Sequence, residues 1–142
     1  MAINSDIRRR CELFFCGALT PGVADIRFFP SKGGTDTGDE IVLEPPYGVV
    51  AAGDEERMMA DEDTWLIPIT ILYVTHMDDT DVVTHSANFR RIQDALKTID
   101  RGVKAEQGIV VHGMDITGGG EVKDEQEKSH ADTISLTLAV SG

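Results

Sequence analysis

The fold of this chain is decided by the stretch Trp65-Leu66-Ile67-Pro68-Ile69-Thr70-Ile71-Leu72-Tyr73-Val74-Thr75-His76. Successive side chains of a β-strand point to opposite faces of the sheet, so alternate residues share a face. One face would carry Trp65, Ile67, Ile69, Ile71 and Tyr73, and the other would carry Leu66, Pro68, Thr70, Leu72 and Val74. Because both sets are mainly apolar, the sequence predicts a central strand with both faces largely covered.

Further strands are expected on both sides of this stretch. Residues 133–140 alternate strictly, with Ile134, Leu136, Leu138 and Val140 on the inward face, and should close an antiparallel sheet. Residues 109–116 form another candidate strand. Residues 23–29 are either a short strand or an extended lead-in, and 41–43 and 47–52 are β-like. Pro45-Pro46 between them predicts a sheet edge or a bend, because proline cannot donate to a strand ladder.

Two helices are expected. The better marked one follows the capping run Asp78-Asp79-Thr80-Asp81 and ends near Arg101-Gly102. Its apolar face would consist of Val82, Phe89, Ile92, Leu96 and Ile99. The other covers residues 5–16, after the capping cluster Asn4-Ser5-Asp6, and should end at Gly17.

Three polar segments should be exposed loops. They are residues 31–39, the acidic stretch 53–63, and residues 118–129, where Gly118-Gly119-Gly120 reads as a turn and the charged remainder as a hairpin tip. The resulting order is α-β-β-β-α-β-β. We therefore expect a single domain over residues 1–142 in the α+β class, with a mostly antiparallel sheet of four to five strands and two helices on one face.

The composition limits the classes of function that fit this chain. With 25 acidic and 13 basic side chains, the net charge of -12 disfavours binding to nucleic acid. The start of the chain lacks the pattern of a signal peptide, and no run of about 18 apolar residues could span a membrane. Cys11 and Cys16 would lie about 140° apart around a helix, so we expect two reduced thiols that pack as small hydrophobic groups.

No motif points to catalysis. His76, His85, His112 and His130 lack the spacing of a metal site, although His112 and His130 could meet if their strands were adjacent. The acidic clusters at 54–56, 61–63 and 78–81 match no calcium loop, and the triple glycine lacks the context of a phosphate loop. The sequence therefore predicts no enzyme, no cofactor and no metal.

The order of elements, the strand at 65–73, the acidic lead into the helix around Phe89, Ile92 and Leu96, and the terminal strand 133–140 resemble the tail terminator (tail completion) proteins of long-tailed bacteriophages. That resemblance implies a homo-oligomeric ring, typically a hexamer, which sits on the last ring of the tail tube, stops tube growth and docks to the head connector. Its place would be the neck of the virion, after synthesis in the host cytoplasm.

The resemblance also implies partners: other copies of the chain, the tail tube protein and the head-tail connector protein. No membrane would be involved, and genomic DNA would pass through an acidic lumen without specific binding. Phe28, Phe29 and Tyr47 are candidate apolar anchors of the ring interface, and packing in the core of the same domain explains them equally well.

Three alternatives remain open at this point. Another neck or tail subunit, such as a head-closure or tube protein, would belong to the same class. A small metal-dependent hydrolase would use His112, His130 and a nearby carboxylate. A ligand-binding or regulatory domain would need a concave pocket.

Overall fold

The computed structural model describes residues 3–19, 26–30, 46–53, 56–57, 64–78, 80–124 and 129–141. The statements below concern these residues. Two helices and six strands occur in the following order: α1 (Ile3–Leu19), β1 (Arg27–Pro30), β2 (Tyr47–Ala52), β3 (Glu56–Arg57), β4 (Thr64–His76), α2 (Val82–Lys97), β5 (Val110–Asp124) and β6 (Ser129–Ser141).

The strands form a mixed sheet in the order β1-β2-β4-β6-β5, and the two-residue β3 pairs with β4. Only β1 and β2 are parallel, and the other pairings are antiparallel. The predicted α+β class and the order α-β-β-β-α-β-β are confirmed, with β3 as a short addition. β2 lies inside the sheet, and Pro46 precedes its first residue, so no ladder bond is lost.

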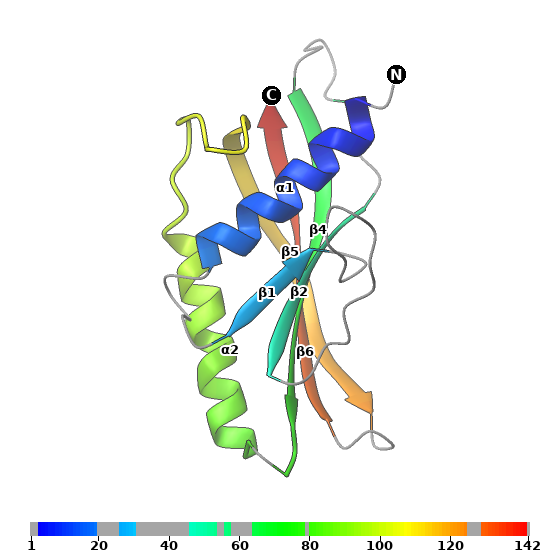
Figure 1. The fold of residues 1–142 in the computed structure, drawn as a ribbon, viewed down its shortest axis with the longest axis vertical. Coiled ribbons are helices and arrows are strands. Elements are labelled where there is room, and N and C mark those ends of the chain that lie inside the picture. The colour runs from blue at the N-terminus through cyan, green and yellow to red at the C-terminus, as the bar shows by residue number, and fades with distance from the viewer. Residues whose placement is uncertain are drawn as a thin grey trace.

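One hydrophobic core lies between the sheet and both helices. In Figure 1, α1 crosses the strands diagonally, while α2 runs beside them along the long axis of the molecule. The alternate residues of β4 and β6 face the helices in register, for example Ile69 opposite Leu136 and Ile71 opposite Ile134. Residues of α1 and α2 complete the same cluster: Ile7, Cys11, Phe15, Leu19, Ile92, Ala95 and Leu96.

The first helix is longer than its sequence pattern suggested. Gly17 does not end α1, which continues to Leu19. Leu19 is fully buried and extends the four-residue spacing of Ile7, Cys11 and Phe15 by one more turn. Packing of this last apolar residue outweighs the low helix propensity of glycine.

The second helix starts as predicted. Asp81 is its N-cap, and its carboxylate oxygen Oδ1 accepts a 2.7 Å hydrogen bond from the backbone N–H of Thr84. The expected inward position of Val82 is wrong, because Val82 is 60% exposed and His85 takes the first buried position of the helix. The inward face therefore begins at His85, about one turn later than expected.

The expected turn at Gly118-Gly119-Gly120 is also wrong. These glycines lie inside β5 and pair with Ser135, Ile134 and Thr133 of β6. The pairing of β5 with β6 shifts by one residue between Val111 and Gly113 and again between Ile116 and Gly118, as at a β-bulge. The turn prediction failed because it considered only the local glycine content, whereas the long neighbouring strand β6 pairs with these residues.

The second face of β4 is less covered than predicted. We call the helix-free side of the sheet the open sheet face, represented by Phe29, Val49, Pro68, Thr70 and Leu72. Both helices lie on the opposite side, and Pro68 and Thr70 are exposed. This face of β4 is thus rich in apolar residues, yet no helix in the described part of the chain covers it.

Candidate functional site

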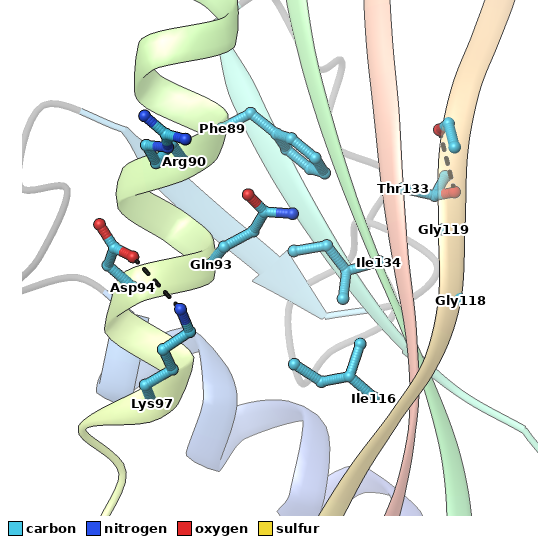
Figure 2. A pocket seen from close by; sticks show the side chains of 11 residues that line it. Phe89, Arg90, Gln93, Asp94, Lys97, Ile116, Gly118, Gly119, Thr133 and Ile134 are labelled. Atoms are coloured by element: carbon cyan, nitrogen blue, oxygen red, sulfur yellow. Dashed lines mark hydrogen bonds and ion pairs between the residues drawn. The ribbon is translucent and has the colours of Figure 1, made fainter.

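A groove separates α2 from the outer part of the sheet. It has a volume of about 540 Å³ and is lined by Phe89, Arg90, Gln93, Asp94, Lys97, Ile116, Gly118, Gly119, Gly120, Thr133 and Ile134. Figure 2 shows Phe89 and Gln93 extending from the helix toward Ile134 and Ile116 on the sheet. We call this feature the α2–β5 groove.

The helical wall of the α2–β5 groove is polar and partly cationic. Arg90, Gln93, Asp94 and Lys97 follow the i, i+3, i+4, i+7 spacing that places residues on one helix face. Lys97 lies 3.8 Å from the Asp94 carboxylate, but both side chains are well exposed, so water screens this pair. Among the described residues, no acidic side chain pairs with Arg90.

The strand wall of the α2–β5 groove is apolar and largely without side chains. Ile116 is 48% exposed, although it points to the same side of the sheet as the buried Leu136. Next to it, Gly119 has a φ of 158°, and a Cβ atom there would overlap the backbone carbonyl oxygen of Thr133. The backbone thus keeps this position free of a side chain and the groove open.

The three aromatic candidates separate onto the two sides of the sheet. Phe28 is buried in the core, and its ring occupies the space next to Gly48. Phe29 and Tyr47 are half-buried on the open sheet face, and the Arg27 guanidinium lies 5.1 Å from the centre of the Phe29 ring. Phe28 therefore has the core role considered from the sequence, whereas Phe29 and Tyr47 lie at the surface of the open sheet face, and their role in an interface stays a prediction.

A chain of polar groups is buried between α2 and the sheet. His85 Nδ1 lies 2.7 Å from the Thr75 hydroxyl, and His85 Nε2 lies 2.7 Å from Asp132 Oδ2. The imidazole of His85 stacks on the ring of Tyr73, with ring centres 4.8 Å apart. The ring centre of His130 lies 5.3 Å from that of His85. Both imidazole nitrogens are thus satisfied, as burial of a polar ring requires.

Thr75, His85 and Asp132 have the residue types of a nucleophile, a base and an orienting acid. However, Thr75 is 0% exposed and His85 is 2% exposed. A substrate could reach the hydroxyl only if α2 separated from the sheet. We interpret these three residues as a structural clamp that joins α2 to β4 and β6.

Sequence reasoning missed this clamp, although a signal was present. Asp132 continues the even-numbered series of Ile134, Leu136 and Leu138, so the period of two places it on the inward face of β6. A carboxylate on a buried face requires a partner. The buried helical residue His85 is that partner.

The proposed meeting of His112 and His130 does not occur. His130 pairs with Lys123 at one end of the β5–β6 ladder, whereas His112 lies at the other end, with Nε2 2.7 Å from the Ser141 hydroxyl. Eleven strand positions separate the two ends, or roughly 36 Å at the usual rise. His76 lies 3.7 Å from the Asp78 carboxylate. No group of three or more metal-ligating side chains occurs among the described residues.

Cys11 and Cys16 form no disulfide. Cys11 is buried in the core, and Cys16 is half-buried beside it. Burial raises the pKa of each thiol to about 12, because a thiolate would lose its hydration there. Both positions agree with the predicted role as small hydrophobic groups.

Neither described helix is long and apolar enough to cross a membrane. The acidic cluster at 78–81 contains the helix cap Asp81, whereas the clusters at 54–56 and 61–63 lie almost entirely outside the described residues. The loop expected at 31–39 lies outside them as well.

Comparisons with known proteins bear on the fold. No protein-family model matches the chain, and no curated protein matches its sequence. Among solved structures, the chain is similar to a chain from the "Virion of native gene transfer agent (GTA) particle", with a TM-score of 0.52 and 12% sequence identity. The match covers 96% of this chain and 94% of that chain. At this identity, the likeness shows a shared fold.

Proposed function

We propose that this protein is a structural component of a phage-like virion and, more specifically, a tail terminator. In this role, copies of the chain form a ring, in the family typically a hexamer, at the head-proximal end of the tail tube. The ring stops tube growth and docks to the head connector. Its partners are other copies of the chain, the tube protein and the connector protein.

The observation that carries this proposal is the end-to-end likeness to a chain from a gene transfer agent virion. Because both chains are matched over nearly their whole length, the likeness concerns a complete fold and not one shared motif. The confirmed order α-β-β-β-α-β-β adds support, since the resemblance to tail terminators was based on that order.

Two surfaces of the described structure support a role in assembly. The open sheet face has no helix on it, and the α2–β5 groove lies at the sheet edge, where β5 pairs only with β6 over most of its length. A strand edge and a partly apolar sheet face are surfaces on which proteins associate. The strong negative charge would let DNA pass the ring without binding.

A role without catalysis forms part of the proposal. The metal-dependent hydrolase considered above relied on His112 and His130, which lie at opposite ends of a ladder. A different neck or tail subunit, such as a head-closure or tube protein, is the closest competing assignment. It would use the same fold but make different contacts in the virion.

The direct test is to mix the purified protein with tail tubes and to examine them by electron microscopy, with light scattering of the protein alone. A terminator should cap one end of each tube and halt further addition of tube protein. Binding along the tube wall, or co-polymerisation into it, would favour another tail subunit. Failure to bind tubes or connectors at any concentration would contradict a role in the neck.

A further inference from the structure

We propose that the α2–β5 groove is a contact between copies of this chain, in which the groove of one copy receives an acidic surface of the next. This inference rests on the proposed ring function and identifies one of its interfaces. Charge, groove chemistry and symmetry each contribute to it.

Charge favours a second copy as the occupant. The lining of the α2–β5 groove holds two cationic side chains, Arg90 and Lys97, and one acidic side chain, Asp94, a net charge of +1 in a chain that carries -12. The rest of the chain therefore carries -13. Any copy of the protein thus presents both a local cationic region and a large acidic excess that complements it.

The groove offers more than charge. Ile116 and the half-buried Phe89 provide an apolar floor beneath the cationic rim. Gly118 and Gly120 have nothing within 4 Å of the place where a Cβ atom would stand, so a partner can approach the backbone of β5 closely. An apolar centre with charged residues at the rim is the usual composition of a protein interface.

Symmetry then decides how the copies meet. A two-fold contact of groove with groove would bring two surfaces of the same net positive charge together, since each groove is lined by Arg90 and Lys97 and by one acidic residue, Asp94, and surfaces of like charge repel. A contact between the groove and a different, acidic surface of the neighbour avoids this repulsion. Such a head-to-tail contact gives every copy one donor and one acceptor surface, so repetition closes a ring when the rotation allows it.

A photocrosslinker at the groove floor tests the contact directly. Ile116 would be replaced by p-benzoylphenylalanine, and Arg91, on the same helix but outside the groove lining, would receive the same group as a control. The purified protein would be irradiated alone and with tail tubes. We expect a covalent dimer of the chain from position 116, crosslinked to an acidic segment, and little from position 91. A crosslink to tube protein alone, or none in either sample, would overturn the inference.

A charge-reversal pair supplies a second measurement. The double variant Arg90→Glu with Lys97→Glu changes the groove rim, whereas Arg91→Glu with Arg101→Glu makes the same change of net charge outside it. The first should raise the concentration needed to cap half of the tubes by about 10-fold or more, and the second should change it much less. Equal effects would overturn the groove contact.

The two tests separate the inference from the proposed function. Capping of tubes without a dimer crosslink at position 116 would leave the terminator assignment in place and refute the groove contact. A dimer crosslink without any capping would support the contact and refute the terminator assignment.

Discussion

The three consecutive glycines of β5 should respond differently to alanine. At Gly119, a Cβ atom would overlap the carbonyl oxygen of Thr133, and the φ of 158° is one that other residues rarely adopt. Backbone strain of this kind costs about 2 kcal/mol, which lowers the melting temperature of a domain of this size by roughly 6 to 8 °C. At Gly118 and Gly120 the space is open, and alanine should be neutral or stabilise the strand by about 0.5 kcal/mol.

Thermal unfolding of the three single variants, followed by circular dichroism, measures this pattern. Only Gly119→Ala should melt clearly below the wild type. The pattern is specific to a paired strand, because in a flexible turn none of the three positions has a fixed neighbour. Equal melting temperatures for all three variants would refute the continuous strand and restore the turn that the sequence suggested.

Three further predictions concern the helices and thiols. Gly17→Ala should raise the melting temperature by a few degrees in thermal unfolding, because Gly17 lies inside α1 with no atom within 4 Å of a new Cβ atom; a lower value would contradict the extended helix. Asp81→Ala should destabilise α2, because the carboxylate of Asp81 caps this helix. The hydrogen bond from the Thr84 N–H lowers the pKa of Asp81, so the stabilisation by the ionised cap should be present above the usual carboxyl pKa and should be lost as the pH falls through the lowered pKa. The melting temperatures of the wild type and the variant, compared over this pH range, measure the effect. Cys11 and Cys16 should resist alkylation at pH 8 until the protein unfolds, and stability should fall as the pH rises from about 9 toward 12; rapid labelling of native protein would show that the thiols are accessible.

Elements with a strong local pattern could be predicted from the sequence. β4 and β6 alternate over many residues, and α2 combines a capping aspartate with a helical apolar period. In each case the information lies within one segment. These elements also bury most of the core, which is why the fold class could be predicted correctly.

The errors concern features that depend on distant parts of the chain. β5 continues through Gly118–Gly120 because β6 pairs with it, and glycine has no side chain to show a period. The open sheet face is apolar enough to suggest a covering element, but only the arrangement of α1 and α2 shows that both lie on the other side. The contact between His85 and Asp132 likewise joins residues 47 positions apart.

The two surfaces identified above are suited to different neighbours. The α2–β5 groove lies on the helix side of the sheet at the β5 edge, whereas the open sheet face lies on the opposite side. One partner cannot readily cover both, so a subunit that uses each can contact two neighbours at once. A ring on the end of a tube has this requirement, because every copy must bind its neighbour in the ring and also a component above or below it. The groove, with its cationic rim, fits contact with an acidic copy of the same chain, and the proposed ring would then use the weakly charged open sheet face for a different partner.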